Sequence, residues 1–557
     1  MITKIYHLPQ VSGHEGEIQE AADIIRSGGL LAIPTETVYG LGANALDPEA
    51  VARIYEAKGR ASDNPLIIHV PDESWLDTYC RDVPPLAYRL AEAFWPGPLT
   101  MILPRKAIVP DRTTGGLDTV GVRCPDHPVT LAIIQAAGVP IAAPSANTSG
   151  RPSCTSAAEV LEDMDGKIQG IVDGGPSSVG VESTILDLTV SPPQLLRPGG
   201  MPLDELEAVC GNITIDKAVT GLLKDGERPR APGMKYRHYA PQAPVTVVAG
   251  RPDKCAAYIQ KRLTPTTGVI CFHEFLPLFP GLEVHDLGPA QDKTEQARRV
   301  FSALRRFDGT GVTEIFAQCP DPAGLGLAIG NRLKKAAGFN VLDLGEDGYT
   351  IPTIGLVGGS GAGKSTVLGC FAAHGFGVID CDRVYHDLLA SSAPLRAALR
   401  SRFGDGVFDG EGLDRKALGA VVFRDRAALE DLNAITFRFI TMEVRRQAAE
   451  MQRAHLPGVV LDAAALLESP LKADCHRLVA VVADDGLRLR RIMARDGLTE
   501  DYARARLAAQ PSQQVYRAAC DDILENNGTR EQLLAQCQAL LERIQLQSID
   551  ERTSLTP

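Results

Sequence analysis

The sequence lacks the cysteine spacing that zinc sites and disulfide-rich domains use. Its 12 cysteines are scattered over 557 residues, and no two of them form a Cys-x-x-Cys pair. Such pairs are a common sequence mark of a structural zinc site, so their absence argues against one. We therefore expect reduced thiols, which are typical of a cytoplasmic protein.

Long apolar runs and an excess of positive charge are also missing. A membrane-spanning helix needs a run of about 18 or more apolar residues, and the sequence contains none. The first residues, MITKIYH, do not form an apolar signal segment, so we predict neither export nor a membrane span. The 57 Lys and Arg against 69 Asp and Glu give a formal net charge of −12. That balance disfavours stable, nonspecific binding to nucleic acid.

What the chain does have is length, which exceeds what one hydrophobic core supports. Short apolar runs alternate with helical stretches throughout, so the fold class is α/β with several domains. The predicted parts are a mixed α/β domain over residues 1–208, a proline-rich linker over 209–241, a small parallel α/β domain over 242–347, a nucleotide-binding α/β domain over 350–546, and a polar tail over 547–557.

The most specific motif is GGSGAGKST at residues 358–366, which fits the P-loop spacing GxxxxGK[ST]. A buried strand is predicted before it, over residues 353–357, and a helix after it. Glycines let backbone N–H groups wrap a phosphate, and the helix N-terminus adds partial positive charge. Lys364 would reach the β- and γ-phosphates of ATP, and Ser365 would hold Mg²⁺. The predicted ATP-binding residues are Gly358, Gly359, Ser360, Gly361, Ala362, Gly363, Lys364, Ser365 and Thr366.

A P-loop alone leaves ATPase, GTPase and kinase open, and two carboxylates narrow the choice. Residues 375–382 predict a second strand that ends in Asp380 and Asp382. On an extended strand these two side chains share one face. A carboxylate near the γ-phosphate can orient an acceptor hydroxyl and take its proton, as in a kinase. The alternative is a pair of surface acids.

Arginines crowd the segment from Leu487 to Arg506. Arg488, Arg491 and Arg495 are spaced so that they share one helical face. An arginine-bearing helix that closes over ATP would neutralise the transferring phosphoryl group and exclude water. The alternative is a solvated helix face. GTPase-type motifs are not evident.

In the first domain, small polar and cationic residues stand at the ends of apolar runs. Four cations could converge on a polyanion, and three neutral side chains suit phosphate and ribose recognition. No Ser-His-Asp pattern is evident, so such a site would work by positioning and charge neutralisation. His69 could equally be a core histidine. The cations are Lys58, Arg60, Arg123 and Arg197, and the neutral donors are Ser145, Asn147 and Ser183.

Several strings in this domain resemble the YrdC-like threonylcarbamoyl-AMP synthases over roughly residues 15–205. They are PTETVYGLG (34–42), KGR (58–60), NPLIIH (64–69), PSANTSG (144–150) and ESTI (182–185). The resemblance implies condensation of L-threonine, bicarbonate and ATP to threonylcarbamoyl-AMP and pyrophosphate, for a tRNA-modification machinery that acts downstream. It implies that Thr35, His69 and Arg123 lie around threonine and the carbamate. It also implies a nucleotide-binding set of Lys58, Arg60, Thr119, Ser145, Asn147, Ser183 and Arg197.

Two further strings resemble the longer, two-domain members of that family. PGMKYRHYAPQ (232–242) is similar to their linker, and IGNRLKKAA (329–337) is similar to the end of their Rossmann-like second domain. The linker resemblance makes Tyr236 and His238 candidate lid residues over the active site, and a structural strap is the alternative. Residues 242–345 carry no GxGxxG fingerprint, so no dinucleotide is predicted there.

The P-loop segment resembles dephospho-CoA kinase across nearly all of residues 353–545. The strings are IDCD (379–382), LNAI (432–435), DAAALLE (462–468), RIMARDG (491–497), ARARLAAQ (503–510) and DILENNG (522–528). The resemblance implies transfer of the ATP γ-phosphate to the ribose 3′-hydroxyl of dephospho-CoA, with a helical lid. Asp382, with Asp380 beside it, would be the base, and Arg491, Arg495 and Arg506 would belong to the lid.

This sequence departs from the kinase pattern on the acceptor side. It has Thr436-Phe437 where the family usually has His-Pro, and Ala464 and Leu467 where the family usually has Pro and Phe. The predicted catalytic residues, Lys364, Asp382, Asp380 and Arg495 here and Lys58 and Arg60 in the first domain, are all present. We therefore predict a bifunctional enzyme. The alternatives are an RNA-binding module coupled to a P-loop ATPase, and a kinase with another small-molecule acceptor.

Overall fold

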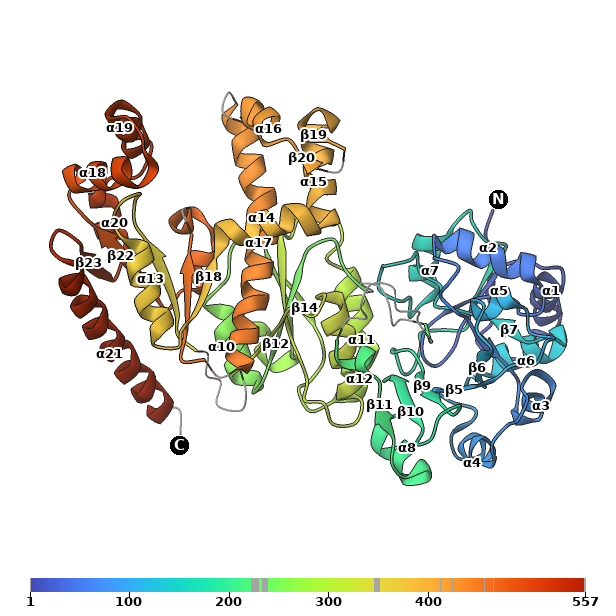
Figure 1. Cartoon of the computed structure of the whole chain (residues 1–557). Coiled ribbons are helices and arrows are strands. Elements are labelled where there is room, and N and C mark those ends of the chain that lie inside the picture. The colour runs from blue at the N-terminus through green and yellow to red at the C-terminus, as the bar shows by residue number, and fades with distance from the viewer. Residues whose placement is uncertain are drawn as a thin grey trace. The chain divides into compact units, whose positions relative to one another are not determined.

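The computed structural model describes residues 2–221, 230–232, 239–344, 351–410, 412–422, 425–454, 456–463 and 465–554. Tyr236, His238 and Ala464 therefore lie outside the described residues. The chain forms two compact units, Met1–Phe339 and Asn340–Pro557 (Figure 1). The small α/β segment predicted over 242–347 thus belongs, up to Phe339, to the same unit as the first domain. Within the described ranges, no helix combines the length and the apolar character needed to cross a membrane.

The first unit is built on a large mixed sheet. Strands β4 and β6 pair in parallel, whereas β5 and β6 pair antiparallel. In spatial order the strands are β1 (Lys4–His7), β8 (Gly170–Asp173), β2 (Leu31–Ile33), β3 (Gly40–Asn44), β7 (Ile141–Ala142), β4 (Ile67–His69), β6 (Thr119–Arg123), β5 (Leu99–Pro104), β9 (Thr184–Asp187), β10 (Gln194–Arg197) and β11 (Thr214–Ile215). The helices are α1 (Glu15–Arg26), α2 (Pro48–Lys58), α3 (Leu76–Tyr79), α4 (Pro85–Phe94), α5 (Asp111–Thr114), α6 (Pro128–Ala137), α7 (Ala157–Met164), α8 (Leu203–Cys210) and α9 (Lys217–Thr220).

Local sequence signals explain how helix α2 presents two cations. Asp47 caps the helix because its side chain accepts a hydrogen bond from the Glu49 N–H. The helix ends at Gly59, whose φ of +63° is a left-handed conformation that glycine adopts without strain. The chain therefore turns sharply between Lys58, the last helical residue, and Arg60, and both side chains reach the same pocket.

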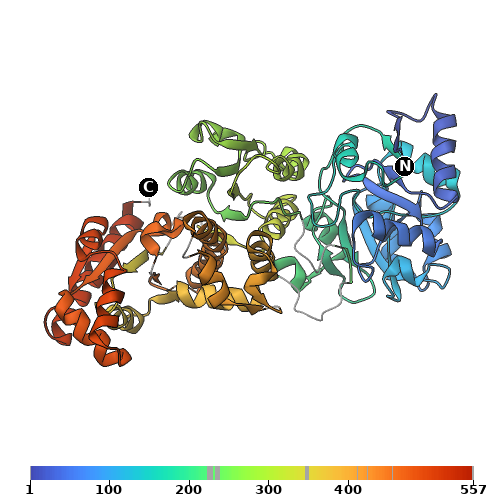
Figure 2. The same cartoon turned by 90° about the horizontal axis from the view of Figure 1, so that it is seen from above.

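The second sheet of this unit is parallel, as the sequence predicts. Its strands include, in spatial order, β14 (Glu283–Asp286), β13 (Thr267–Cys271), β15 (Glu314–Gln318) and β12 (Val245–Ala249). Helices α10 (Pro252–Gln260), α11 (Lys293–Arg305) and α12 (Gly326–Ala336) pack around it, green in Figure 2. A short strand, β16 (Val341–Asp343), follows Phe339 in the sequence.

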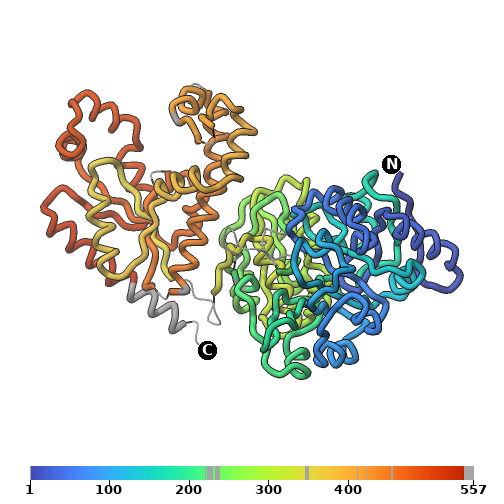
Figure 3. The backbone as a smooth tube through the Cα atoms, turned by 45° about the vertical axis from the view of Figure 1, so that its right-hand side comes forward, coloured from blue at the N-terminus to red at the C-terminus, as the bar shows by residue number. Residues whose placement is uncertain are grey.

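The second unit is a parallel sheet with helices around it, yellow to red in Figure 3. The strand order is β18 (Gly377–Asp380), β21 (Val459–Asp462), β17 (Thr353–Val357), β22 (Arg477–Val482) and β23 (Asp522–Glu525), with a small hairpin of β19 (Phe408–Asp409) and β20 (Gly412–Leu413). The helices are α13 (Lys364–Ala373), α14 (Cys381–Ser391), α15 (Ala393–Phe403), α16 (Arg415–Val422), α17 (Arg426–Arg453), α18 (Asp485–Asp496), α19 (Glu500–Ala508), α20 (Gln513–Ala519) and α21 (Arg530–Ser554). Helix α21 extends into the segment that the sequence analysis treated as a tail.

Candidate active sites

A pocket in the first unit gathers most of the residues that the sequence singles out there. Its walls come from the end of α2, strands β4, β6 and β10, and the loops after β7 and before β9. Eight of the predicted residues line it: Lys58, Arg60, His69, Arg123, Ser145, Asn147, Ser183 and Arg197.

The pocket is cationic, and its cations are partly withdrawn from water. Lys58 is 2% exposed, and its Nζ donates to the carbonyl oxygens of Ser145 and Asn147 at 2.5 Å each. Burial, together with the charge of Arg60, lowers the pKa of Lys58 to about 7. Burial likewise lowers the pKa of Arg60 and of Arg197 to about 10. Such cations gain electrostatic energy when a bound anion replaces the lost solvent.

His69 lines the pocket as a neutral side chain. Its Nδ1 lies 3.3 Å from the Ile141 carbonyl oxygen on the neighbouring strand. Burial, reinforced by the nearby charge of Arg123, lowers the pKa of His69 to about 3. His69 therefore contributes a hydrogen-bonding group and no charge near neutral pH.

Arg123 and Arg197 are held by groups on neighbouring strands and loops. A terminal nitrogen of Arg123 lies 2.7 Å from Glu36 Oε2, and both side chains are about 5% exposed. Arg197 donates from Nε and from one terminal nitrogen to the Ser183 carbonyl oxygen, at 3.1 and 2.9 Å. These contacts fix both guanidinium groups before any ligand binds, which limits reorganisation on binding.

The structure places two predicted residues away from the pocket lining. Thr35 uses its hydroxyl to shape the turn after β2, since Oγ1 donates to the Val38 carbonyl oxygen at 2.7 Å. Thr119 begins β6 opposite Pro104 and lines a smaller cavity that shares Ile67 and Pro232 with the pocket. Tyr236 and His238 lie outside the described residues.

Sequence reasoning did not select several residues that line the pocket. Arg151 and Glu182 adjoin or belong to the motifs PSANTSG and ESTI, so their positions were a usable signal. Tyr239 lies near the end of the predicted linker, and its ring centroid is 5.1 Å from that of Phe301 on α11. No local pattern points to that contact. The residues missed are Thr37, Ser149, Arg151, Glu182 and Tyr239.

The P-loop of the second unit follows β17, as the spacing predicts. Side chains from other segments donate hydrogen bonds to its backbone carbonyl groups. Arg488 Nε donates to Ser360 O at 3.0 Å, and Arg491 donates to Gly361 O at 3.3 Å. Asn526 Nδ2 donates to Ala362 O at 2.7 Å. Gly363 has φ of +105°, and a Cβ there would lie 2.2 Å from Asn526 Nδ2, so only glycine fits. The loop is thus rigid, with helix α13 starting at Lys364.

Lys364 faces a carboxylate that the sequence analysis did not select. Its Nζ lies 3.3 Å from Asp462 Oδ1, at the end of strand β21. Burial raises the pKa of Asp462, with Lys364 opposing that shift and the charges of Asp380 and Asp382 adding to it. The carboxyl ends of β18 and β21 therefore bring Asp380 and Asp382 near Asp462, the acid that faces the P-loop lysine.

The predicted geometry of Asp380 and Asp382 is wrong. Strand β18 ends at Asp380, and α14 begins at Cys381, so the two acids do not share the face of an extended strand. Asp380 caps the helix because its Oδ1 accepts from the N–H groups of Asp382 and Arg383 at 3.0 Å each. Asp382 therefore lies in the first turn of α14, whereas the Asp380 carboxylate is used to cap that helix.

The arginines of α18 and α19 divide into two groups. Arg488 is 2% exposed and, with Arg491, contacts the P-loop backbone. Arg495 and Arg506 are exposed and share one acid, with Arg495 Nε 2.7 Å from Asp496 Oδ1 and Arg506 2.9 Å from Asp496 Oδ2. Only the second group has the exposure expected of a lid that meets its ligand on closing.

Two of the residues that depart from the kinase pattern, Thr436 and Phe437, lie inside one long helix. Helix α17 continues through Thr436 and Phe437, and Thr436 Oγ1 donates to the Leu432 carbonyl oxygen at 2.8 Å. Proline at position 437 would interrupt this helix. Leu467 packs against the core beside β17 and β21.

A pocket of fixed cations in one unit and a P-loop with facing acids in the other define a fusion of two nucleotide-using enzymes. Family models match both parts. "Telomere recombination" covers residues 23–199, "Threonylcarbamoyl-AMP synthase, C-terminal domain" covers 201–338, and "Dephospho-CoA kinase" covers 352–532.

Individual relatives agree. A threonylcarbamoyl-AMP synthase of Pyrococcus abyssi is 51% identical over 59% of this chain and 96% of its own length. A dephospho-CoA kinase of Shouchella clausii is 36% identical over 32% of this chain and 91% of its own length. The crystal structure of P. abyssi Sua5 complexed with L-threonine covers 62% of this chain and 99% of its own, with a TM-score of 0.58 and 49% identity. The chain therefore belongs to the threonylcarbamoyl-AMP synthase family in its first unit and to the dephospho-CoA kinase family in its second. It is a bifunctional, ATP-using enzyme with both activities.

Proposed function

We propose that the cationic pocket of the first unit binds L-threonine, bicarbonate and ATP together. The observation that carries this proposal is the convergence of four cations, Lys58, Arg60, Arg123 and Arg197, on one pocket. Bicarbonate, the threonine carboxylate and a triphosphate are all anions, and their mutual repulsion must be offset for them to meet.

The reaction needs no protein nucleophile. The threonine amino group and bicarbonate form a carbamate with loss of water, and a carbamate oxygen attacks the α-phosphorus of ATP, releasing pyrophosphate. The chain's residues neutralise charge and hold the reactants in line, which is catalysis by positioning. His69, neutral near pH 7, is placed to hydrogen-bond a substrate without adding charge.

The experiment supplies the purified chain with threonine, bicarbonate and ATP and measures threonylcarbamoyl-AMP. Arg60→Gln should lower product formation about 100-fold, because one fixed cation is lost from the transition state. Arg26→Gln, on the exposed face of α1, is the matched control and should leave the rate unchanged. Equal losses in both variants would contradict the assignment of the pocket.

For the second unit, we infer that ATP lies with its β- and γ-phosphates on the P-loop and Lys364. Oxygen ligands suit Mg²⁺, so the Ser365 hydroxyl and the Asp462 carboxylate, which faces the neighbouring Lys364, are oxygen donors that fit this ion. Bound Mg²⁺ would supply charge neutralisation on the phosphates. Asp382, on the first turn of α14, would orient the ribose 3′-hydroxyl of dephospho-CoA and accept its proton.

Asp382→Asn tests this role. It should lower kcat for CoA formation about 100-fold while the KM for ATP stays near the wild-type value, because the amide cannot accept the proton. Asp387→Asn, an exposed acid on the same helix, is the control.

We further propose that released threonylcarbamoyl-AMP passes to a tRNA-modification machinery. The salt-sensitive RNA affinity that the RNA-binding alternative predicts should be absent.

A further inference from the structure

Glu182 is unusual in the synthase pocket because it is a negatively charged side chain in a site proposed to bind anions. Of the described residues that line the pocket, only Glu182 carries a carboxylate. It is 6% exposed and lies directly before Ser183, which also lines the pocket. An unneutralised carboxylate there would repel a triphosphate and a carbamate.

The group that neutralises Glu182 comes from the Rossmann-like second domain. Arg332, on helix α12, is 0% exposed, and its Nε donates to Glu182 Oε2 at 2.6 Å. Its terminal nitrogens donate to the Pro198 carbonyl oxygen and to Asn331 Oδ1 at 2.9 Å each. Arg332 therefore spans two segments of the first domain, one that carries Glu182 and one that directly follows Arg197.

These two segments are also packed against each other. The Gly200 N–H donates to the Glu182 carbonyl oxygen at 2.9 Å. A Cβ at Gly199 would lie 2.2 Å from that same oxygen, so the backbones are in close contact. A displacement of Glu182 would therefore be transmitted to Arg197 and Ser183, which line the pocket.

The surroundings keep Glu182 ionised. Burial alone would raise its pKa, but Arg332 and Arg197 together with a 2.7 Å hydrogen bond from Ser153 Oγ lower the pKa to about 2. Lys335 on α12, Lys58 on α2 and the phenol of Tyr239 also face this carboxylate. Removing Arg332 takes away the largest of the charges that stabilise the ionised form.

We propose that Arg332 is a positioning residue for the synthase reaction: it neutralises Glu182 and fixes the loops that carry Glu182 and Arg197, so that the pocket stays positive toward ATP. The second domain thus supplies a residue that supports the active site without lining the pocket. The proposal rests on the proposed binding of ATP in this pocket.

Five variants of the full chain test it: Arg332→Gln, Arg332→Lys, Glu182→Gln, the double variant Glu182→Gln/Arg332→Gln, and Ser302→Ala. Ser302 Oγ donates to Glu159 Oε1 at 2.7 Å and so joins the two domains away from Glu182, which makes Ser302→Ala the control for domain docking. Both tryptophans, Trp75 and Trp95, belong to the first domain, so their fluorescence reports whether it is folded.

Arg332→Gln should raise the KM for ATP about tenfold, with a smaller change in kcat, because the negative charge of Glu182 in the pocket is no longer neutralised. Arg332→Lys, which keeps the charge, should fall between this variant and the wild type. The double variant should return the KM to within about threefold of the wild type, because its charge balance is restored. Ser302→Ala should match the wild type.

The pH dependence gives a readout that a structural role would not produce. In Arg332→Gln, loss of the Arg332 charge raises the Glu182 pKa, so the carboxylate takes up a proton at a higher pH than in the wild type. The ratio of its ATP KM to that of the wild type should therefore shrink as the pH is lowered, and the ratio for the double variant should stay flat.

A double variant that is folded and no better than Arg332→Gln would overturn the proposal, as would an equal defect in Ser302→Ala. If Arg332→Gln does not fold, the double variant still decides: an ATP KM near wild type supports the proposal, and a tenfold increase contradicts it. Failure of the wild-type chain to make threonylcarbamoyl-AMP would instead count against the proposed pocket function.

Discussion

Lys364 Nζ lies 3.3 Å from Asp462 Oδ1, so the P-loop lysine is paired with the acid that ends the neighbouring strand. The register of β17 and β21, in which Leu356 is opposite Asp462, brings the two together at the carboxyl edge of the sheet. Ligand sites in open α/β sheets lie at this edge. The pair links the P-loop to the acids that would receive the acceptor hydroxyl.

Asp462→Asn is expected to lower kcat for dephospho-CoA phosphorylation about 100-fold, because Lys364 loses its partner and a potential metal ligand is removed. Steady-state kinetics of CoA formation measure the effect. Asp409→Asn, on the exposed hairpin strand β19, is the control. An unchanged kcat in Asp462→Asn would show that the pair is dispensable.

The pKa of Lys58 predicts a pH dependence of the synthase reaction. Because burial lowers that pKa to about 7, the side chain is cationic below this pH and neutral above it. Since the cation attracts ATP, kcat/KM for ATP should fall as the pH rises through about 7. Measurements of kcat/KM for ATP at saturating threonine and bicarbonate would show this decline, which forms the alkaline limb of the pH profile.

Lys58→Arg should flatten this limb, because arginine stays charged. Lys335 provides the alternative, since burial lowers its pKa to about 7 as well. If the limb persists in Lys58→Arg and disappears in Lys335→Gln, the titrating group is Lys335.

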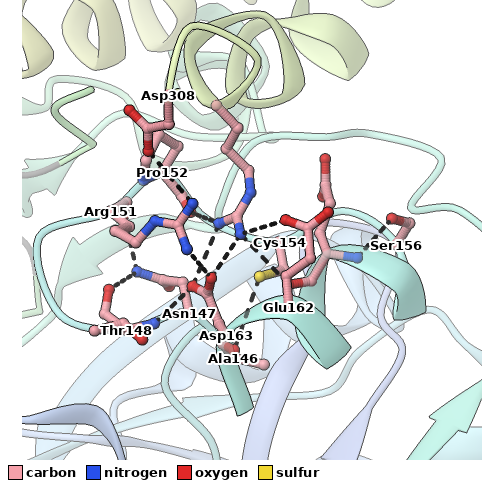
Figure 4. A network of polar contacts seen from close by, with 12 residues as sticks. Ala146, Asn147, Thr148, Arg151, Pro152, Cys154, Ser156, Glu162, Asp163 and Asp308 are labelled. Atoms are coloured by element: carbon pink, nitrogen blue, oxygen red, sulfur yellow. Dashed lines mark hydrogen bonds and ion pairs between the residues drawn. The ribbon is translucent and has the colours of Figure 1, made fainter. Parts of the chain in front are cut away.

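A further buried ion pair of the first unit, between Arg305 and Asp163, is expected to stabilise the fold. Arg305 of α11 lies 2.7 Å from Asp163 of α7, and both side chains are nearly inaccessible. Figure 4 shows Asp163 beside Arg151 and Thr148, with Arg151 also reaching Asp308. Arg305→Met should lower the free energy of unfolding by about 1.5–3 kcal/mol, because the buried Asp163 carboxylate loses one of its two arginine partners.

Urea unfolding followed by tryptophan fluorescence measures this loss in the first unit. Lys4→Ala breaks an exposed pair with Glu20 and should leave the unfolding midpoint in place. Equal shifts in the two variants would mean that burial of the Arg305 pair contributes nothing.

Arg488 should support ATP binding without touching ATP. It holds the Ser360 carbonyl oxygen at 3.0 Å and also donates to Gln510 Oε1 at 3.0 Å. Arg488→Ala is expected to raise the KM for ATP in the kinase reaction about tenfold, because the loop loses a buried, charge-assisted hydrogen bond. Arg490→Ala, exposed on the same helix, should have no effect. A similar KM in both variants would contradict this role.

Local patterns predicted the parts of the structure that depend on neighbours in sequence. The strand at 353–357 and the P-loop after it are where the spacing places them, because strand, turn and helix signals are all local. The parallel pairing of the small second sheet was also predictable from strands alternating with helices. Residue type alone identified four of the five cations among the described residues that line the synthase pocket, and Arg151 is the one that was missed.

What could not be predicted depends on capping or on distant contacts. Asp380 was assigned to a strand face because nothing in the spacing shows that its side chain caps α14. Asp462 becomes adjacent to Lys364 only through the register of β17 and β21. Glu182 and Arg332 are separated by 150 positions, so their contact follows from domain packing alone.

The two active sites of this chain are expected to work independently, and paired assays on the same preparations test this independence most directly. Threonylcarbamoyl-AMP and CoA formation would be measured for the wild type, Lys364→Ala and Arg197→Gln. We predict that Lys364→Ala loses only CoA formation and that Arg197→Gln loses only threonylcarbamoyl-AMP formation. Loss of both products in either folded variant would contradict this independence.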